Sequence, residues 1–355
     1  MKKALHVLGK IERSGMERML ASSHELWKEF GWEVKIISLS EKSEYQETLM
    51  KMGYQIENLP DPWSLSGLLK MVRLFRETKP EVIHNHVERR HALTSLVAYM
   101  AINNSKRVRT VHSNFPDQGF RYIIRRVQNF VERFTGFTII VPSTDVQLNE
   151  EILWKRRTHL IENWAPKYEL GQGRSPNLDE IRMLILGNCS EIKRHEIAFK
   201  LADDISKKND HKLRIVVHHV GSSLGASASE IRILGSVPDR YKIIEHGSLA
   251  EPQNVLQQSD CLIITSSREG QSVSMLEAIR MGIPCLAIAV PGLKWAESIP
   301  TVFLAENDTS LFKAFERFLA DRNSPIPNEV LRKIDERFSP VRGVRDYCRL
   351  YEGVK

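Results

Sequence analysis

The stretch CLIITSSREGQSVSMLEAIRMGIP, residues 261–284, shows in one segment how this chain builds its fold. It opens with apolar and β-branched residues, which are typical of a strand covered on both faces. Ser272 has the side chain of a helix N-cap, and Gly282 followed by Pro284 is a helix stop signal. The stretch therefore predicts a buried strand, a turn and a helix in immediate succession.

Short apolar runs alternate with helical stretches along the rest of the chain. The stretches 15–30, 65–77 and 192–206 have the periodicity of amphipathic helices. Apolar strands joined by helices predict parallel sheets covered by helices on both faces, and therefore an α/β protein with doubly wound sheets. The ten expected strands are ALHVLG, EVKIISL, EVIHNHV, RVRTVH and FTIIVPS in the first half, and IRMLILGN, LRIVVHHVG, KIIEHG, CLIITSS and PCLAIAV in the second.

A polar stretch rich in proline and glycine interrupts this alternation at residues 163–180. Such a composition is typical of an interdomain linker. A chain of 355 residues also exceeds what one hydrophobic core usually supports. We expect an N-terminal domain over residues 1–165, a linker over 166–180 and a second domain over 181–335, with a cleft between two Rossmann-like domains.

The composition is that of an ordinary globular protein, with 42% hydrophobic and 27% charged residues. No apolar run approaches the roughly 20 residues that span a bilayer. The apolar run near the N-terminus is shorter than the h-region of about 7–15 residues in a secretory signal. We therefore expect a cytoplasmic protein with free, buried thiols at Cys189, Cys261, Cys285 and Cys348.

The formal net charge of +7 indicates a surface that attracts anions. Residues 106–133 hold seven lysines and arginines against two acids, interleaved with Phe115, Phe120, Tyr122 and Phe130. A basic amphipathic helix there either lies on an anionic membrane, on the inner face of the cell membrane, or packs its apolar face inward. Zinc patterns, RNA-recognition signatures and continuous basic helices are absent from the sequence, so we expect no nucleic-acid partner.

Candidate functional residues in the first half follow the expected strands, because ligands of open α/β sheets bind outside the carboxyl ends of strands. Gly15 lies in the turn before a helix, where backbone amides can face an anion, although such turns are common. His112 follows the strand near residue 110 and is either a cleft residue or a structural one. His84 and His86 share one strand face, but no third ligand has matching spacing, so we expect no metal site.

Candidate residues in the second half carry both signs of charge. Lys193 and Arg194 fall in the first turn of the helix expected over 192–206. The helix dipole disfavours cations there, unless a polyanion lies between the cations and the helix N-terminus. Glu269 directly follows a strand, and Glu277 lies inside the next helix. Carboxylates accept hydrogen bonds from the paired hydroxyls of sugars and ribose, and the helix start offers amides to phosphate. One extended ligand that consists of a sugar, a diphosphate and a ribose would bind to both carboxylates and to the amides at the helix start.

The stretch from Glu269 to Glu277 resembles the E-x7-E signature of the family 4 glycosyltransferases, which are retaining enzymes of the GT-B fold. Four other segments are similar to parts of that family. ERSGMERML resembles its Gly-Gly-x-Glu-Arg turn, with Ser14 where glycine is usual, and TVHSNF resembles its histidine segment. LIENW falls where the family often has Ile-Pro-Asn-Gly. The closing segment, within residues 336–355, is similar to the last helix, which crosses back to the first domain.

The resemblance implies a role for each matching residue. Glu269 would bind hydroxyls of the donor sugar, Glu277 the ribose and Lys193 the diphosphate. His112 would lie beside the transferred sugar, and Gly15 would approach the donor phosphate or the acceptor. Backbone amides near the sugar and phosphates would come from Gly270, Gln271 and Ser272.

One position departs from the family pattern. An arginine usually follows the glycine of the first strand of the second domain, five residues before the lysine, and here Asn188 takes its place. The diphosphate then lacks one bidentate guanidinium. Either Arg194 or another cation replaces it, or donor binding is weaker or altered.

The resemblance implies a retaining, metal-independent glycosyltransferase that uses a nucleotide-diphosphate sugar, with a UDP-sugar favoured, and needs no cofactor. Its acceptor would be a hydroxyl of a glycan, a lipid-linked molecule or a small molecule, in bacterial cell-surface polysaccharide or glycoconjugate synthesis. The alternatives are a sugar-nucleotide epimerase or phosphorylase of the same fold, and a non-catalytic nucleotide-sugar or glycan binder. The sequence lacks the G-x-G-x-x-G fingerprint, which argues against a nicotinamide enzyme.

Overall fold

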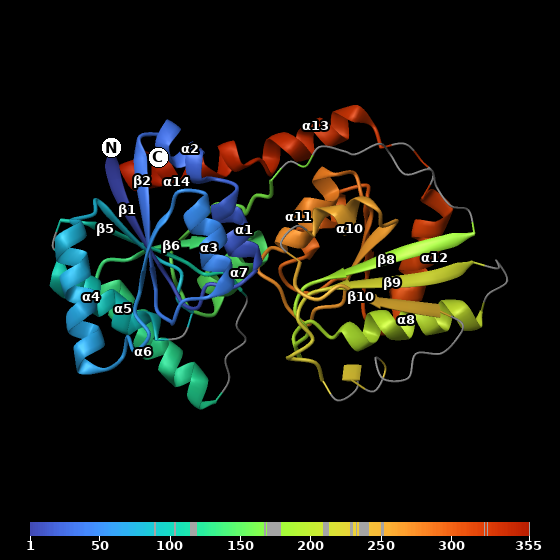
Figure 1. Ribbon diagram of the computed structural model, residues 1–355, viewed down its shortest axis with the longest axis horizontal. Helices are drawn as coiled ribbons and strands as arrows, with labels where there is room; N and C mark the ends of the chain where they lie inside the picture. Colours follow the sequence, from blue (N-terminus) through green and yellow to red (C-terminus); the bar gives the residue numbers. More distant parts are fainter. Residues whose placement is uncertain are drawn as a thin grey trace. The chain divides into compact units, whose positions relative to one another are not determined.

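The chain forms two compact units in the computed structural model (Figure 1), one of residues 1–164 with Pro340–Lys355 and one of Ala165–Ser339. Each unit has one sheet of parallel strands, so the prediction of a doubly wound α/β protein is confirmed. Most of the expected linker, and residues 114–118 of the basic segment, lie outside the described residues. The structure describes residues 1–88, 90–102, 104–113, 119–166, 168, 179–208, 213–227, 230–231, 233, 241–249, 252–322, 324 and 326–354.

The first unit contains a seven-stranded sheet in the order β3-β2-β1-β4-β5-β6-β7. Its strands are β1 (Lys2–Leu8), β2 (Trp32–Ser38), β3 (Gln55–Asn58), β4 (Val82–Asn85), β5 (Lys106–Thr110), β6 (Thr138–Val141) and β7 (Thr158–Leu160). Its helices are α1 (Gly15–Ala21), α2 (His24–Glu29), α3 (Glu44–Lys51), α4 (Leu65–Thr78), α5 (His91–Ala101), α6 (Phe120–Phe134), α7 (Thr144–Ile152) and α14 (Pro340–Glu352).

Alternate residues of the strands in this sheet enter two different cores. Leu5 of β1 and Ile83 of β4 pack with Phe75 of α4 and residues of α5 in a hydrophobic core. On the opposite face, His6 of β1 lies against His84 of β4, at a ring-centroid distance of 4.8 Å. This second core is built largely from rings, which also include Trp27, Trp32, Tyr347 and Tyr351.

The C-terminal helix α14 belongs to the first unit, as the sequence predicts. Lys2 at the start of β1 forms a 2.6 Å ion pair with Glu352 near the helix end. Gly343 lies so close to Trp164 that a β-carbon at this position would come within 2.1 Å of the indole ring. The helix therefore completes the second core of a sheet whose last strand, β7, ends 180 positions before the helix begins.

The second unit contains a six-stranded sheet in the order β10-β9-β8-β11-β12-β13. Its strands are β8 (Glu180–Leu186), β9 (Arg214–Val220), β10 (Tyr241–Glu245), β11 (Cys261–Ile264), β12 (Cys285–Ile288) and β13 (Val302–Ala305). Its helices are α8 (His195–Lys207), α10 (Gln253–Gln257), α11 (Val273–Arg280), η1 (Lys294–Ser298), η2 (Asp308–Ser310), α12 (Leu311–Asp321) and α13 (Asn328–Arg337).

Both faces of this second sheet are apolar. Leu262 of β11 faces a core formed with α10, α11 and α13, whereas its neighbour Ile263 faces a core formed with α8 and α12. Burial on both sides explains why β8, β11 and β12 read as continuous apolar runs. All ten expected strands are present. The three that the sequence analysis missed, β3, β7 and β13, lie at sheet edges and have only three or four residues each.

The strand order reverses direction at one point in each sheet. In the first sheet this switch point lies between β1 and β4, and in the second between β8 and β11. Open α/β sheets bind ligands outside the carboxyl ends of the strands at such a point. The segments that follow β1, β4, β8 and β11 are therefore where a functional site is expected.

Two further predictions about the chain can be compared with the structure. All four cysteines are free and buried, as expected. Within the described part of the chain, no helix has the length and apolar character needed to cross a bilayer.

Candidate functional site

The loop after β8 and the loop after β11 meet at the switch point of the second sheet. The Thr265 hydroxyl, just after β11, donates to the carbonyls of Lys193 and Arg194 at 2.9 Å each. The Ser267 amide donates to the Ile192 carbonyl at 2.7 Å. These bonds hold the two loops together through backbone carbonyls. The backbone positions that carry the side chains at the loop tips are therefore fixed.

Lys193 and Glu269 form the central contact of this site. The Lys193 ammonium lies 2.7 Å from Glu269 Oε1, and the Ser266 hydroxyl donates to the same oxygen at 2.6 Å. The lysine side chain is 31% exposed and the glutamate side chain 13%, so the pair lies at the rim of the loop cluster and not in the core. Two residues that the sequence analysis places on one donor are therefore neighbours in space.

Gly292 supports the backbone under Glu269. The Glu269 amide donates to the Pro291 carbonyl at 3.1 Å, which brings the loop after β12 against the loop after β11. A β-carbon on Gly292 would lie 2.1 Å from the Glu269 carbonyl oxygen and 2.8 Å from that of Gly270. Gly292 also has a φ of +91°, which side-chain-bearing residues rarely adopt.

The helix that follows, α11, begins as its sequence predicts. Ser272 is the N-cap, and its side chain accepts a hydrogen bond from the Met275 amide at 3.4 Å. Gly270, Gln271 and Ser272 are buried, which places their backbone at the base of the loop cluster. Glu277 lies within the helix with 1% of its surface exposed, and Tyr168 donates to its Oε1 at 3.3 Å.

The structure corrects the expected position of Lys193 and Arg194. They do not lie in the first turn of a helix, because α8 begins only at His195. Arg194 is the N-cap residue and has a left-handed φ of 49°, which ends the preceding turn. Its guanidinium donates to the Thr265 carbonyl at 3.0 Å and pairs with Asp308 at 3.2 Å. These bonds tie Arg194 to β11 and η2, so the side chain already has a structural role.

Asn188 also takes part in the loop architecture. Its side-chain oxygen accepts a hydrogen bond from the Ser222 amide at 2.9 Å, which links the loops after β8 and β9. Gly221, directly after β9, lies so close to Gly187 that a β-carbon at this position would come within 2.0 Å of the Gly187 carbonyl. The residue that replaces the usual arginine therefore fastens the loop that leads to Lys193.

A buried cluster lies beneath this loop. Cys189 Sγ is 3.4 Å from His195 Nδ1 and 3.8 Å from His219 Nε2. Burial raises the pKa of the Cys189 thiol to about 12, so the group stays neutral. His219 already has partners at both ring nitrogens, namely Glu245 at 2.9 Å and the Gly187 carbonyl at 3.0 Å. These contacts connect the ends of β8, β9 and β10.

In the first unit, His112 follows β5 as expected and joins a row of histidines. His112 Nε2 is 2.9 Å from His86 Nδ1, and His86 Nε2 is 3.1 Å from His6 Nδ1. Burial, with a smaller effect of Arg109, lowers the pKa of His112 to about 4. Burial also lowers the pKa of His6 to about 3. His112 is therefore a neutral imidazole at physiological pH.

The row continues to the C-terminal helix. The Tyr351 hydroxyl bridges His6 Nε2, at 3.2 Å, and His84 Nδ1, at 2.5 Å. His84 Nε2 lies 2.8 Å from the Thr110 hydroxyl, which in turn lies 3.2 Å from the Tyr347 hydroxyl. One unbroken hydrogen-bonded chain therefore connects His112 with two tyrosines of α14.

Gly15 and Glu17 occupy the turn after β1. Gly15 is the first residue of α1, with Ser14 as the N-cap. Glu17 is 2% exposed, and the Ser14 hydroxyl donates to its carboxylate. Burial raises the pKa of Glu17 to about 7, against which the Ser14 bond acts in the opposite direction. The turn thus holds a carboxyl group that is partly protonated near neutral pH.

Among the described residues, two groups of side chains have the residue types of a metal site. One consists of His6, His84 and His86, and the other of Cys189, His195 and His219; within each group the ligand atoms lie within 4.8 Å of one another. The first group contains the third histidine that the sequence analysis did not find, because His6 comes from a neighbouring strand. Its ring nitrogens bond to one another or to His112, Tyr351 and Thr110.

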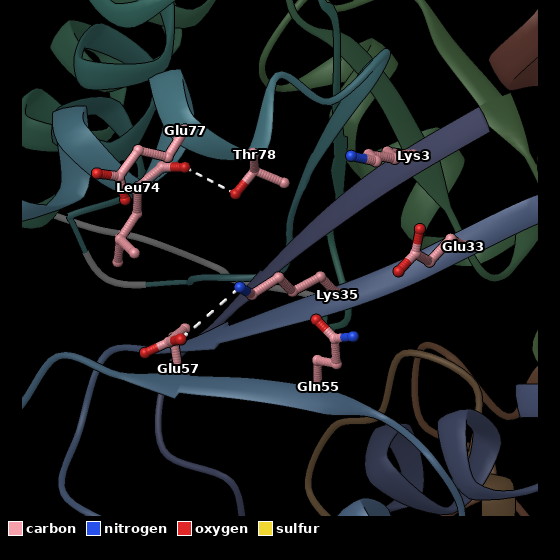
Figure 2. Close-up of a pocket in the computed structure, with 8 residues that line it drawn as sticks. All are labelled: Lys3, Glu33, Lys35, Gln55, Glu57, Leu74, Glu77 and Thr78. Atoms are coloured by element: carbon pink, nitrogen blue, oxygen red, sulfur yellow. Dashed lines mark hydrogen bonds and ion pairs between the residues drawn. The ribbon is translucent and has the colours of Figure 1, made fainter. Parts of the chain in front are cut away.

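A hollow of about 260 Å³ lies elsewhere in the first unit, at the amino ends of β1, β2 and β3 (Figure 2). Lys3, Glu33, Lys35 and Glu57 line it, and Lys35 pairs with Glu57 at 3.7 Å. This edge of the sheet is opposite to the carboxyl ends at which ligands of such folds bind. The hollow is therefore a mixed-charge surface depression outside the candidate site.

Most predicted site residues follow the strands that the sequence analysis named. The structure brings Lys193, Glu269 and Arg194 together in the second unit and places Gly15 and His112 in the first. Gly292 was missed because its requirement comes from a loop that is distant in sequence. Glu17 had a signal, since Ser-x-x-Glu before an apolar run is a capping pattern.

Comparisons with known proteins were made for sequence and for structure. Residues 13–163 match the family model described as Glycosyltransferase Family 4, and residues 180–321 match the model described as Glycosyl transferases group 1. A search of curated proteins returned no match.

Several solved structures are similar to this chain over nearly its whole length. One from Rickettsia africae has a TM-score of 0.79 at 15% identity and covers 99% of this chain and 98% of its own. HepE of Anabaena in complex with UDP-glucose has a TM-score of 0.77 at 13% identity, covering 99% and 100%. TarM of S. aureus, in complex with fondaparinux, α-GlcNAc-glycerol and UDP, has a TM-score of 0.72 at 12% identity, covering 99% and 100%. At these identities the likeness shows the fold.

Proposed function

Since this chain belongs to the family 4 glycosyltransferases and has their GT-B fold, we propose that it transfers a sugar from a UDP-sugar to an acceptor hydroxyl with retention of configuration. The observation that carries the proposal is the 2.7 Å contact between Lys193 and Glu269 at the switch point of the second sheet. It joins a cation for a diphosphate with a carboxylate for sugar hydroxyls at the place where this fold binds ligands.

Lys193 has the position and charge to stabilise the leaving diphosphate. Charge builds up on the phosphate oxygens as the bond to the sugar breaks, and a cation already in place lowers the barrier. Glu269 and the loop carbonyls that accept from Thr265 fix the lysine before the donor arrives. Such preorganisation supports a mechanism in which Lys193 and backbone amides near Ser272 take the role that a metal has in other transferases.

Glu269 is better suited to binding than to nucleophilic attack. Its Oε1 already accepts from Lys193 and Ser266, which fixes the orientation of the carboxylate. A carboxylate held in this way accepts hydrogen bonds from neighbouring sugar hydroxyls. In the proposed mechanism the leaving phosphate takes the acceptor proton on the same face of the sugar, so retention needs no covalent sugar–enzyme intermediate. Glu277, buried in α11, would hold the ribose.

The choice of substrates rests on the fold neighbours and on the sequence. HepE is solved with UDP-glucose and TarM with UDP, which supports a uridine nucleotide as the donor. We propose a glycan or lipid-linked acceptor, in bacterial cell-surface polysaccharide or glycoconjugate synthesis at the cytoplasmic face of the membrane. His112, a neutral imidazole at a strand end of the first unit, would lie beside the transferred sugar, with Gly15 near the donor phosphate or the acceptor.

Substitution of the central pair tests this function. Glu269→Ala and Lys193→Ala are each expected to lower turnover at least about tenfold, because each removes an interaction made with the reacting donor. Lys200→Ala is the matched control, since Lys200 forms an ordinary 3.0 Å pair with Asp204 on α8. The measurement is UDP release from UDP-sugars in the presence of acceptor extract, with and without EDTA. Wild-type rates in both variants would refute the proposal, and loss of activity in EDTA would refute metal independence.

A second candidate is a nucleotide-sugar binder without turnover. It is favoured by Asn188 and Arg194, because the first is not a cation and the second is already bonded to Thr265 and Asp308. The donor diphosphate would then have Lys193 as its main cation. A donor that raises the melting temperature without any UDP release would select this candidate. No thermal response to any nucleoside diphosphate or its sugars would exclude both.

A further inference from the structure

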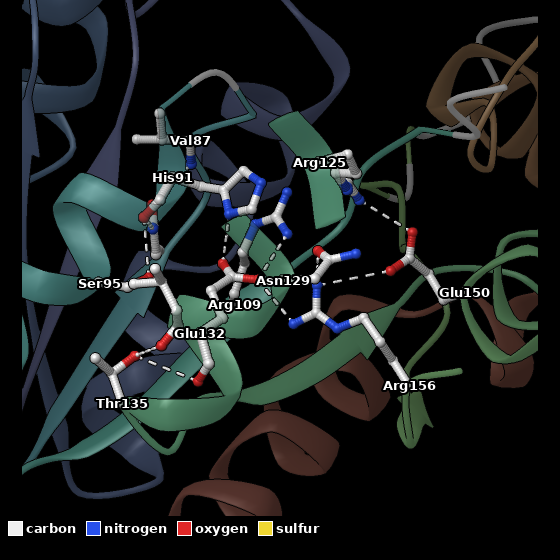
Figure 3. Close-up of polar contacts among 12 residues, drawn as sticks. Val87, His91, Ser95, Arg109, Arg125, Asn129, Glu132, Thr135, Glu150 and Arg156 are labelled. Atoms are coloured by element: carbon white, nitrogen blue, oxygen red, sulfur yellow. Dashed lines mark hydrogen bonds and ion pairs between the residues drawn. The ribbon is translucent and has the colours of Figure 1, made fainter. Parts of the chain in front are cut away.

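Helix α6 has its polar side inside the protein and its apolar side outside. Its buried residues are Arg125, Asn129 and Glu132, which Figure 3 shows pointing into a cluster of polar side chains. A surface helix of a globular protein normally has the opposite arrangement, with an apolar stripe that faces the core. The apolar residues of α6 must therefore find their partners outside this unit or remain in water.

A buried ionic network holds α6 in this orientation. Glu132, with no exposed side-chain surface, accepts from His91 at 2.7 Å, Arg156 at 2.7 Å and Arg109 at 3.2 Å. Arg125 of the same helix pairs with Glu150 of α7 at 3.0 Å (Figure 3). Rotating the helix to bury its apolar face would break all of these bonds. The outward position of the apolar side is thus a fixed property of the fold.

The outward apolar residues lie on two helices that pack against each other. The α5 and α6 helices pack side by side, and Tyr99 of α5 meets Phe134 of α6 at a ring-centroid distance of 5.8 Å. Single exposed apolar residues are normal on proteins, but a contiguous patch marks an interaction site. We call these residues the apolar face. They are Leu93, Leu96, Tyr99 and Met100 of α5, and Phe120, Ile123, Ile124, Val127, Phe130 and Phe134 of α6, each between 38% and 75% exposed.

The charges around the apolar face are all positive on α6. Arg121, Arg126 and Arg133 are exposed, whereas the single acid of the helix, Glu132, is buried in the network. At about 3.6 residues per turn, Arg121 lies on one side of the apolar row and the other two arginines lie on the opposite side. The sequence of α5 contains no lysine, arginine or acid. An apolar centre with basic borders is complementary to an anionic lipid surface.

We propose that the apolar face is a membrane-docking surface, which inserts among the acyl chains of an anionic bilayer while Arg121, Arg126 and Arg133 contact lipid phosphates. The proposal stands on the orientation of α6 and is independent of the proposed sugar transfer. If both hold, docking would bring the first unit to an acceptor that is anchored in the same bilayer. The two proposals can also fail separately, because vesicle binding is measured without a nucleotide.

Flotation of the full-length chain with vesicles tests the docking surface. The protein is expected to float with vesicles of phosphatidylcholine and phosphatidylglycerol, and much less with phosphatidylcholine alone. High salt is expected to weaken binding to the anionic vesicles, because it screens the arginine–phosphate attraction. Equal binding to both vesicle types, or none to either, would overturn the proposal.

Removal of the apolar centre is the first variant. The triple substitution Ile123→Ser, Val127→Ser and Phe130→Ser is expected to reduce vesicle binding at least about tenfold, because less apolar surface is transferred into lipid. These side chains point away from the ionic network, so the thermal midpoint is expected to stay near that of the wild type. The matched control is Met50→Ser with Leu224→Ser and Val341→Ser, which removes three exposed apolar side chains from other elements. Equal vesicle binding by the two triple variants would contradict the proposal.

Removal of the basic border is the second variant. Arg121→Gln with Arg126→Gln is expected to lower binding to anionic vesicles at least about tenfold and to leave binding to neutral vesicles unchanged. The control is Lys200→Gln with Lys333→Gln, which removes two exposed cations elsewhere. Arg133 is kept because it also donates to the Lys155 carbonyl at 2.9 Å. A dimer that the Ser triple variant dissociates, without vesicle binding by the wild type, would assign the apolar face to a second copy of the chain instead.

Discussion

Gly292 decides at the residue scale where the Glu269 backbone can lie. The loop after β12 approaches the loop after β11 so closely that no β-carbon fits between Gly292 and the carbonyls of Glu269 and Gly270. The Glu269 amide is also bonded to the residue before this glycine. The position of a predicted donor-binding carboxylate therefore depends on a residue 23 positions later that has no side chain.

The substitution Gly292→Ala is expected to lower the affinity for the donor and the thermal midpoint. The left-handed φ costs about 1–2 kcal/mol for a residue with a β-carbon, and the clash must displace the Glu269 carbonyl as well. Gly31→Ala is a matched control, because Gly31 has a φ of +82° and open space around its expected β-carbon. The two variants differ in the clash alone. Equal loss of stability, with donor affinity retained in both, would show that Gly292 does not position Glu269.

Residue identities at strand ends were the part of the site that the sequence could predict. Lys193 and Glu269 follow strands with clear apolar signatures, and the switch-point rule brings strand ends together. Gly292 and His6 were out of reach, because their roles arise from contacts between loops and strands that are distant along the chain. Arg194 was predicted inside the helix but is its N-cap, because a left-handed φ cannot be predicted from an arginine.

Helix α6 shows at the element scale that an apolar stripe does not tell which side of a helix is buried. The sequence predicts an amphipathic helix in residues 106–133 and leaves open whether its apolar side faces inward. In the structure the polar side of α6 is the buried one, because Arg125, Asn129 and Glu132 bond to residues of β5, α5 and the α7–β7 segment. Those partners are not adjacent in sequence, so periodicity alone could not reveal them.

Other element boundaries followed local signals. The N-cap Ser272 and the stop at Gly282 predicted α11 well. The helix expected over residues 15–30 instead divides into α1 and α2. Ser23 interrupts it, with a side chain that donates back to the carbonyls of Met19 and Leu20 at 2.9 and 3.0 Å. Serine side chains that bond to the preceding backbone compete with a continuous helix.

The ionic network under α6 predicts a large effect of one substitution. Glu132→Gln is expected to destabilise the first unit by about 3–5 kcal/mol, because the buried guanidinium groups of Arg109 and Arg156 lose their shared carboxylate. Burial alone would raise the pKa of Glu132, but Arg109, His91 and Arg156 hold it well below its ordinary range. The carboxylate is therefore charged in the folded protein, and denaturant unfolding measures its contribution.

An exposed ion pair is the control for this variant. Arg73 and Glu77 form a 2.6 Å pair on α4, with more than half of each side chain exposed. Glu77→Gln is expected to leave the unfolding midpoint where it is, because exposed pairs contribute little. Similar midpoints for Glu132→Gln and Glu77→Gln would mean that the network does not hold the helix in place.

The buried histidines determine at the scale of the whole molecule how stability depends on pH. Burial lowers the pKa of His6 and His91 to about 3 and that of His112 to about 4 in the first unit, and that of His195 to about 3 in the second. In the unfolded chain these groups titrate near 6.5. Between these values the unfolded state binds more protons than the folded state, so stability increases with pH.

Thermal unfolding is therefore expected to shift to lower temperature as the pH falls from about 6.5 toward 4. Each of these histidines contributes about 1.4 kcal/mol per pH unit within its window. Glu17 acts in the opposite direction between pH 4.5 and about 7, because its pKa is raised in the folded state. Three of the four histidines belong to the first unit, so that unit is expected to unfold first. His6→Asn should flatten the pH dependence, and a midpoint that does not change from pH 7.5 to 5 would contradict this reading.

The hydrogen-bonded chain from His112 to Tyr347 has a direction. A neutral histidine carries one ring proton, so it donates at one nitrogen and accepts at the other. If His112 donates at Nε2, then His86, His6, Tyr351, His84 and Thr110 must each donate to the next member, and reversing one link reverses them all. The tautomer of His112 is thus coupled to whether the hydroxyl of Tyr347, 235 positions later, donates or accepts in this chain. Tyr347→Phe, which removes the last hydroxyl of this chain, is therefore expected to change the balance between the two tautomers of His112.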